Sequence, residues 1–128
     1  MKTVLLTDDN EDIIELVTLI LAKSGYILKV AHNGKEALHI CRDTPPDLVI
    51  LDLRMPDIDG FTVTKALRGS GFKKPIVILT GSESEEDRDK AFAAGCDDYV
   101  VKTMEMRDLE FLIDSYLQKG GGLKKSSS

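Results

Sequence analysis

The chain has 128 residues, of which 42% are hydrophobic and 30% are charged, so it is long enough to bury a respectable core as one soluble domain. No apolar stretch approaches the roughly 20 residues needed to span a membrane, and the first residues lead into a strand-like segment, so we expect a cytoplasmic location with no membrane association. The net charge of −5 disfavours direct nucleic-acid binding, which relies on basic patches.

Five apolar segments alternate with five segments of helical periodicity along the chain. The expected strands lie near residues 3–7, 27–31, 48–52, 76–80 and 98–101. The expected helices lie near residues 11–23, 35–42, 61–68, 84–94 and 106–118. Because the strands are apolar throughout, this alternation is typical of a parallel sheet with helices on both faces. The predicted fold class is therefore a doubly wound α/β sandwich.

The fourth expected helix has the thinnest apolar face. A Ser82-x-x-Glu85 capping box is expected to open this helix. Its apolar contacts come only from alanines, such as Ala91 and Ala94, together with Phe92. A helix that buries so little surface is expected to be mobile.

The end of the chain differs in composition from the rest. Residues 119–128 consist mainly of glycine, lysine and serine and contain no acidic residue. We expect a single domain over residues 1–118, followed by a flexible tail or linker over residues 119–128.

The cysteines and histidines are isolated from one another. Cys41 and Cys96 have no second cysteine or histidine at ligand spacing, so we expect two reduced thiols. His32 and His39 are equally isolated, which argues against a zinc site and against a histidine phosphodonor in this chain.

Polar and charged residues occupy the ends of four expected strands. Asp8 and Asp9 follow the first strand, and Asp52 closes the third. Thr80 closes the fourth strand, and Lys102 follows the fifth. Because ligands bind at the carboxyl ends of parallel strands, which lie at one edge of the sheet, we expect three carboxylates, one hydroxyl and one ammonium group to converge there.

These residue types suit phosphoryl transfer. Three carboxylates in one cleft repel one another, and a hard divalent cation such as Mg²⁺ keeps all of them ionised. A metal-bound carboxylate can attack a phosphoryl group whose oxygens are neutralised by the cation and a lysine, while a hydroxyl donates a hydrogen bond. The expected product is an aspartyl phosphate.

Three sequence phrases carry a family resemblance. They are DLRMPDIDG at residues 52–60, LTG at 79–81 and GCDDYVVK at 95–102. Together with the acidic pair after the first strand, they make the chain similar to the receiver domain of two-component response regulators. The resemblance covers about residues 4–117, and several motifs in the family's order are more specific than any single one. It implies a flavodoxin-like fold with five helices and strand order 2-1-3-4-5.

The resemblance implies a phosphorylation site and a metal site. Asp52 corresponds to the phosphoacceptor. Asp8 and Asp9 correspond to the acidic pair that holds Mg²⁺ together with Asp52, and the backbone carbonyl of Arg54 supplies a further oxygen. Gly60 would permit the turn that leads from the loop into the third helix.

The resemblance also implies a switch. Thr80 corresponds to the switch hydroxyl, Lys102 to the phosphate-binding lysine and Tyr99 to the aromatic switch residue. A phosphoryl group would draw Thr80 and Lys102 inward, and Tyr99 would occupy the vacated space. The face formed by the fourth helix, fifth strand and fifth helix would then be repacked for a partner.

The expected function is that of a signalling phosphoacceptor switch rather than an enzyme. The phosphoryl donor would be a phosphohistidine on a sensor histidine kinase or a histidine phosphotransfer protein, in two-component signalling or a phosphorelay. The target would be a downstream protein or effector domain that binds the repacked face.

Two positions depart from the family pattern. The lysine is normally followed by proline in a cis bond, whereas Thr103 follows Lys102, and a cis bond before a residue other than proline costs about 2.5–4 kcal/mol. We therefore expect a trans bond, with the flexible Lys102 side chain still reaching Asp52. Gly81 replaces the usual alanine after Thr80 and should loosen that loop.

Three alternative functions differ in what they require. An aspartate-nucleophile phosphohydrolase of the haloacid dehalogenase type needs a second acid two residues after the nucleophile, where this chain has Arg54. A flavin or nucleotide domain needs a phosphate loop after the first strand, but residues 8–12 are mostly acidic and would repel phosphate. A receiver-like interaction module that is never phosphorylated is favoured only by the Lys102-Thr103 pair.

Overall fold

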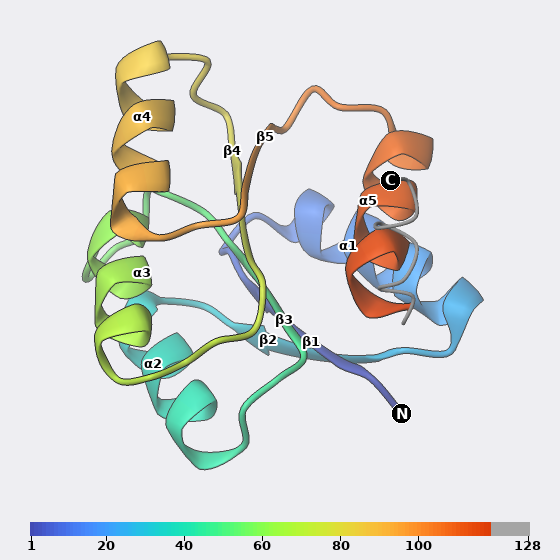
Figure 1. Ribbon diagram of the computed structural model, residues 1–128. Helices are drawn as coiled ribbons and strands as arrows, with labels where there is room; N and C mark the ends of the chain where they lie inside the picture. Colours follow the sequence, from blue (N-terminus) through green and yellow to red (C-terminus); the bar gives the residue numbers. More distant parts are fainter. Residues whose placement is uncertain (119–128) are drawn as a thin grey trace.

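The computed structural model describes residues 1–118, which form five strands and five helices (Figure 1). In chain order the elements are β1 (Thr3–Thr7), α1 (Glu11–Ser24), β2 (Ile27–Ala31), α2 (Gly34–Asp43), β3 (Leu48–Leu51), α3 (Gly60–Gly69), β4 (Ile76–Thr80), α4 (Glu85–Ala94), β5 (Asp98–Val101) and α5 (Met106–Leu117). Each expected element is present, with ends within one residue of the expected ones. The expected tail, residues 119–128, lies outside the described residues. Within residues 1–118, no helix is both long and apolar enough to cross a membrane.

All five strands are parallel and lie in the order β2-β1-β3-β4-β5. Helices α2, α3 and α4 cover one face of the sheet, and α1 and α5 cover the other (Figure 1). This is the doubly wound, flavodoxin-like architecture that the sequence predicts. Thr7 pairs with Leu51 and Thr80 pairs with Val101, so the residues that follow these strands emerge at one edge of the sheet.

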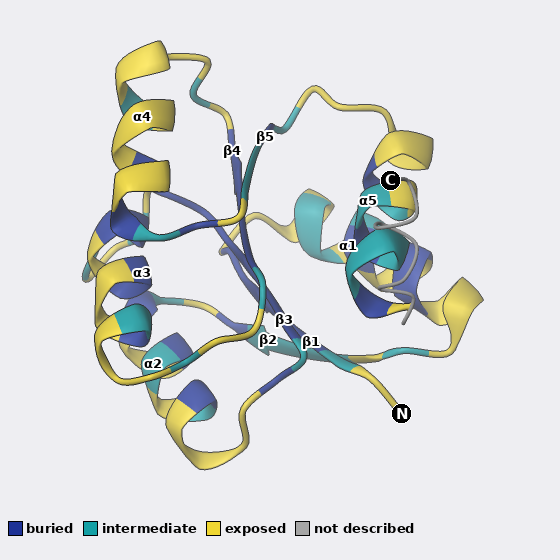
Figure 2. Cartoon of the chain, in the orientation of Figure 1, coloured by how far each residue is buried: buried dark blue, intermediate teal, exposed yellow. Residues whose placement is uncertain are grey.

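Two hydrophobic cores enclose the sheet, one on each face (Figure 2). Leu5 and Val49 belong to the core beneath α2, α3 and α4. Leu6 and Ile50, the next residues along the same strands, belong to the core beneath α1 and α5. Because both sides of these strands are buried, their sequences are apolar throughout instead of alternating.

The ends of α1 follow from local signals in the sequence. Asn10 precedes the helix, and its side chain accepts hydrogen bonds from the backbone N–H groups of Asp12 and Ile13 at 2.9 and 3.2 Å. Gly25 ends the helix with φ at 76°, in the left-handed region where glycine avoids a steric penalty. The start of α1 directly follows the acidic pair at the end of β1, so this cap also helps to fix that loop.

The start of α4 differs from the prediction. Its N-cap is Ser84, whose Oγ accepts a hydrogen bond from the backbone N–H of Asp87 at 3.2 Å. The predicted Ser82-x-x-Glu85 capping box is therefore wrong. Both serines precede an acidic residue by three positions, so spacing alone does not distinguish them.

The apolar face of α4 is thinner than the sequence indicates. The helix buries only Ala91 and Ala94. Phe92, predicted among the apolar contacts, is exposed, and the Arg88 guanidinium lies 5.2 Å from its ring centroid. A helix with so few buried contacts is a suitable element to move.

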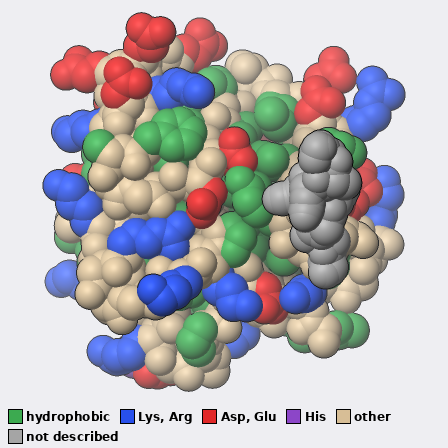
Figure 3. All heavy atoms as spheres, viewed as in Figure 1, with side chains coloured by type: hydrophobic (Ala, Val, Ile, Leu, Met, Phe, Trp, Pro, Cys, Tyr) green, Lys and Arg blue, Asp and Glu red, His purple; other side chains and the backbone are tan. Residues whose placement is uncertain are grey.

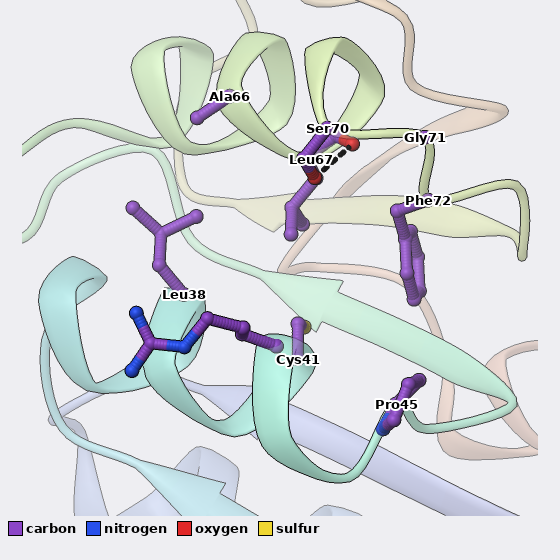
Figure 4. A pocket seen from close by; sticks show the side chains of 9 residues that line it. Leu38, Cys41, Pro45, Ala66, Leu67, Ser70, Gly71 and Phe72 are labelled. Carbon is purple, nitrogen blue, oxygen red and sulfur yellow. Dashed lines mark hydrogen bonds between the residues drawn. The ribbon is translucent and has the colours of Figure 1, made fainter.

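A hollow of about 480 Å³ lies between α2 and α3 (Figure 4). Leu38 and Cys41 line it from α2, and Leu67 lines it from α3. The loops before β3 and β4, which contribute Pro45 and Phe72, close one end of the hollow. These loops belong to the amino-terminal edge of the sheet, so the hollow is remote from the predicted site residues.

Candidate functional site

Three of the predicted site residues meet at the carboxyl edge of the sheet. Asp8 follows β1, Asp52 follows β3 and Lys102 follows β5. Lys102 Nζ lies 3.0 Å from Asp8 Oδ2 and 3.2 Å from Asp52 Oδ2. Asp8 and Asp52 are both buried, with exposed fractions of 1% and 8%. One ammonium group therefore bridges two buried carboxylates.

The sheet fixes the backbone positions from which these side chains start. The backbone N–H of Asp52 donates to the carbonyl of Thr7 at 3.1 Å, and that of Lys102 donates to the carbonyl of Thr80 at 2.8 Å. These hydrogen bonds continue the parallel ladder one residue beyond β3 and β5. The acid and the lysine are therefore held by the rigid end of the sheet, which is where a precise site is best supported.

Burial raises the pKa of the Asp52 carboxyl above its ordinary value, and the charge of Asp8 raises it further. The Lys102 ammonium and the backbone N–H of Arg54 lower it, but by less. Burial alone would lower the pKa of Lys102, yet its hydrogen bonds and charge interactions with Asp8 and Asp52 outweigh burial and raise that pKa. Lys102 is therefore firmly charged, and the two acids still repel each other.

Asp8 is held by one hydrogen bond and one ion pair. Its Oδ1 accepts from the backbone N–H of Asn10 at 3.0 Å, and its buried Oδ2 is paired with the Lys102 ammonium at 3.0 Å. A carboxylate oxygen has more than one lone pair, so these oxygens can still take a further ligand, and hard divalent cations take oxygen ligands of this kind. The carboxylates of Asp8 and Asp52 therefore suit Mg²⁺, and the carbonyl of Arg54, two residues after Asp52, stays a predicted ligand.

Asp9 does not join Asp8 and Asp52. Its side chain is exposed, and within residues 1–118 no three acidic, cysteine or histidine side chains lie close enough to hold a metal ion between them. Of the three carboxylates that we expected to converge, Asp8 and Asp52 lie together and Asp9 does not. Neighbouring residues of an extended segment point in opposite directions, so Asp8 and Asp9 do not both face Asp52 in this backbone conformation.

Thr80 and Tyr99 are linked through Ser82, in the loop between β4 and α4. The buried Thr80 hydroxyl oxygen accepts a hydrogen bond from the backbone N–H of Ser82 at 3.2 Å. The Tyr99 hydroxyl donates to the carbonyl of Ser82 at 3.0 Å. The two predicted switch residues are therefore held by the backbone of the same loop residue.

A second connection of Ser82 is absent from the sequence-based site. Ser82 Oγ donates a hydrogen bond to Asp87 Oδ2 at 2.7 Å, and Arg54 Nη2 lies 3.3 Å from the same oxygen. Asp87 belongs to the first turn of α4 and is not among the site residues that the sequence predicts. In the sequence, Asp87 is marked only by its position three residues after Ser84, and spacing alone does not show that Ser84 is the N-cap.

The loop between β3 and α3 lies close against Asp52. A Cβ atom on Gly60 would lie 2.5 Å from the Asp52 carbonyl oxygen, so only glycine fits there. The φ of Gly60 is not in the positive region, so the turn, contrary to the prediction from the sequence, does not require glycine at this position. Close packing against Asp52 requires it instead. On the same loop, the Asp57 carboxylate accepts a hydrogen bond from the backbone N–H of Gly34 at 2.8 Å, which ties the loop to α2.

The bond between Lys102 and Thr103 is trans, as predicted. The lysine nevertheless reaches Asp52, which confirms that its side chain spans the distance without a following proline. The departure from the family pattern at position 103 therefore leaves the ammonium group in the site.

The sheet order and the polar cluster define a class of doubly wound α/β domains that bind ligands at the carboxyl edge. The family model for the response regulator receiver domain matches residues 4–114. The chain belongs to this family, the receiver domains of two-component response regulators, which act as signalling switches.

Individual relatives agree with this assignment. The chain is 35% identical to the transcriptional regulatory protein PrrA of Mycobacterium leprae, over 98% of this chain and 54% of PrrA. A putative response regulator from Chloroflexus aurantiacus has 32% identity and a TM-score of 0.85, over 92% of this chain and 98% of that one. The BeF3-activated receiver domain of Klebsiella pneumoniae RstA has 28% identity and a TM-score of 0.85, over 92% and 100%. The chain spans about half or less of the curated relatives it matches.

Proposed function

We propose that Asp52 accepts a phosphoryl group from a phosphohistidine on a sensor histidine kinase or a histidine phosphotransfer protein. The observation that carries this proposal is the Lys102 ammonium, 3.2 Å from Asp52 Oδ2 and 3.0 Å from Asp8 Oδ2. A preorganised cation beside the nucleophile neutralises the oxygens of an incoming phosphoryl group. A carboxylate can then approach phosphorus without strong repulsion.

The transfer forms one bond and breaks one. An Asp52 carboxylate oxygen attacks phosphorus and forms the P–O bond of an acyl phosphate. The P–N bond breaks, its electron pair leaves with the imidazole nitrogen, and the donor imidazole takes up a proton from solvent. Lys102 then turns from the carboxylates to a phosphoryl oxygen, and the Thr80 hydroxyl donates a hydrogen bond to another.

Asp8, Asp52 and the Arg54 carbonyl are the groups that would hold Mg²⁺, and the exposed Asp9 side chain would have to turn toward them to take part. When bound, the cation neutralises phosphoryl oxygens and relieves the repulsion between the carboxylates. The support is that a single ammonium group faces two buried carboxylates, together with the raised pKa of Asp52.

The proposed output is a change at the face formed by α4, β5 and α5, where a downstream protein or effector domain would bind. If the Thr80 hydroxyl turns toward the phosphoryl group, its hydrogen bond with Ser82 breaks and the loop before α4 is released. Tyr99 on β5 also holds Ser82, so both switch residues act on this loop. The small buried face of α4 lets the helix follow the loop.

This proposal includes a cytoplasmic location, no membrane association and no direct nucleic-acid contact through this domain. It also rejects the alternative function of a receiver-like interaction module that is never phosphorylated. Only the Lys102-Thr103 pair favoured that alternative, and Lys102 lies beside Asp52 without a following proline.

The test is the intact mass of the chain after incubation with acetyl phosphate. We expect the gain of one phosphoryl group with Mg²⁺ and no gain with excess chelator. Asp52→Asn should show no gain, because it lacks the nucleophile. Thr80→Ala should still be phosphorylated, because it loses only the hydroxyl that responds to the phosphoryl group, but it should fail to bind a phosphorylation-dependent partner. A parent chain that never gains mass would overturn the proposal.

A further inference from the structure

Ser82 makes four hydrogen bonds in the loop between β4 and α4. Its backbone N–H donates to Thr80 Oγ1 at 3.2 Å, and its carbonyl accepts from the Tyr99 hydroxyl at 3.0 Å. Its side-chain Oγ donates to Asp87 Oδ2 at 2.7 Å and accepts from the backbone N–H of Ser84 at 3.2 Å. One residue therefore connects both switch residues to the first turn of α4.

Asp87 holds Ser82 from the side of the helix. In an ordinary capping box, the acidic residue at this position would bind the backbone N–H of the cap, Ser84. Here the hydroxyl of Ser82 is inserted between them, because it accepts from the Ser84 N–H and donates to the Asp87 carboxylate. The Asp87 side chain is only 19% exposed, whereas Ser84 lies at the surface.

Arg54 joins the same carboxylate from the phosphoacceptor loop. Its Nη2 lies 3.3 Å from Asp87 Oδ2, and its own position is two residues after Asp52. The Arg54 side chain is 68% exposed, and an exposed ion pair of this kind contributes modestly to stability. A contact of this strength can break and form again at little cost in free energy, as a switch requires. Arg54 therefore connects the loop that follows Asp52 to the first turn of α4.

We infer that Ser82 is a positioning residue, held by Asp87, which Arg54 contacts in turn, and that it keeps the Thr80 hydroxyl in its unphosphorylated arrangement. We call these three residues, Ser82, Asp87 and Arg54, the Ser82 latch. The inference rests on the proposed phosphorylation of Asp52. A phosphoryl group there takes the Thr80 hydroxyl from the Ser82 N–H and attracts the Arg54 guanidinium away from Asp87.

The Ser82 latch favours one of two states, so weakening it shifts the population toward the other. Asp87→Asn removes the charge that Arg54 contacts while keeping an oxygen that can accept from Ser82. Ser82→Ala removes both side-chain hydrogen bonds of the latch. Both substitutions should therefore loosen the loop whose Ser82 carbonyl contacts the Tyr99 hydroxyl before any phosphoryl group arrives, and Ser82→Ala should loosen it further.

The test follows Tyr99 by fluorine NMR in the full chain labelled with 3-fluorotyrosine. The chain contains three tyrosines, and Tyr99→Phe assigns the signal by its loss. Beryllofluoride with Mg²⁺ serves as the phosphoryl analogue. In Asp87→Asn without beryllofluoride, we expect the Tyr99 signal to move part of the way toward its beryllofluoride-bound position in the parent. The beryllofluoride concentration for half conversion should fall by about 2–5-fold, the range expected for loss of an exposed ion pair.

Glu86→Gln is the matched control, because it removes one negative charge from the same turn of α4 at an exposed position. It should leave the Tyr99 signal and the half-conversion concentration unchanged. Arg54→Gln should match Asp87→Asn, and the double variant should shift no further than either single one, because both remove the same contact.

Two outcomes separate this inference from the proposed function. If Asp87→Asn and Ser82→Ala leave the Tyr99 signal where Glu86→Gln leaves it, the latch is overturned, whatever beryllofluoride does. If the parent does not respond to beryllofluoride, phosphorylation of Asp52 is contradicted instead. A Tyr99 shift in the unligated Asp87→Asn chain would then still support the positioning role of Ser82.

Discussion

Lys102 is the residue on which both acids at the carboxyl edge depend. Its ammonium lies within 3.2 Å of Asp8 and Asp52, so it offsets part of their repulsion in a buried setting. One base facing two acids leaves a net negative charge. The site is therefore prepared for a divalent cation and, through the same lysine, for the oxygens of a phosphoryl group.

Mg²⁺ should stabilise the chain by mass action, by about 2.7 kcal/mol at 100 times its dissociation constant. Asp8→Asn should remove most of this gain, because it removes one of the two buried carboxylates that would bind the cation. Asp9→Asn should also remove most of it if the exposed Asp9 carboxylate completes the site. Thermal melts with Mg²⁺ and with chelator measure these effects.

Asp12→Asn is the control for this measurement, because Asp12 is an exposed acid in the first turn of α1. Its response to Mg²⁺ should equal that of the parent. An Asp8→Asn chain that gains as much from Mg²⁺ as the parent would contradict the metal-site assignment, and an unchanged response of Asp9→Asn would remove Asp9 from that site.

The two cysteines should behave as inert thiols. Burial raises the pKa of both Cys41 and Cys96 to about 11, and for Cys96 the charges of Asp97 and Asp98 add to this effect. The folded state holds these protons more tightly than the unfolded state, where the ordinary value is 9.0. The resulting stabilisation is complete below pH 9 and is lost as the pH rises toward 11.

Denaturant unfolding between pH 8 and pH 11 should therefore show a falling free energy of unfolding, with a smaller fall in the Cys41→Ala/Cys96→Ala variant. At pH 8, Ellman's reagent should react slowly with the folded chain and quickly with both thiols after unfolding. Equal rates for folded and unfolded chain would contradict the burial of these thiols.

At the scale of elements, α4 is held more firmly at its ends than along its length. At its C-terminal end, the carbonyl of Gly95 accepts a hydrogen bond from Arg68 Nε at 2.9 Å, and Arg68 Nη2 donates to Asp97 Oδ2 at 2.8 Å. Between the two ends, only Ala91 and Ala94 are buried. The helix can therefore shift when its first turn is released, while Arg68 keeps its last turn in place.

Gly60→Ala tests whether the start of α3 must lie against Asp52. The added Cβ would meet the Asp52 carbonyl oxygen at 2.5 Å, so the backbone must move. We expect a loss of about 1–3 kcal/mol in the free energy of unfolding, as for other overpacked sites, and slower phosphorylation by acetyl phosphate.

Gly69→Ala is the matched control in the last turn of the same helix, where an added Cβ meets nothing within 4 Å. It should be neutral or stabilising by up to about 1 kcal/mol, because alanine favours a helix more than glycine does. Equal effects of the two substitutions in urea unfolding would show that close packing at Gly60 is unimportant.

At the scale of the whole molecule, negative charge gathers at the end of α4 that the proposed switch would release. Acidic side chains gather over the N-terminal end of α4 in Figure 3, where Glu83, Glu85, Glu86 and Asp89 are exposed. This end adjoins the loop that carries Ser82. A partner that binds the proposed face of α4, β5 and α5 would therefore meet negative charge beside α4.

The elements and the strand-end residues were predictable from sequence, because they follow from local periodicity and from one topological rule about parallel sheets. The link between Arg54 and Asp87 was not, because these residues lie 33 positions apart and meet only when the loop after β3 packs beside α4. Two further details depend on tertiary structure: Asp9 is exposed, and Phe92 faces solvent.

Chemical trapping of the phosphorylated residue tests the central claim most directly. The full chain is incubated with Mg²⁺ and acetyl phosphate, reduced with borohydride, which converts an acyl phosphate to an alcohol, and digested for peptide mass mapping. Phosphorylation of Asp52 predicts homoserine at that position alone, and none when Mg²⁺ is removed by a chelator. Reduction at another acid, or an unreduced Asp52 in a chain that has gained a phosphoryl group, would contradict it.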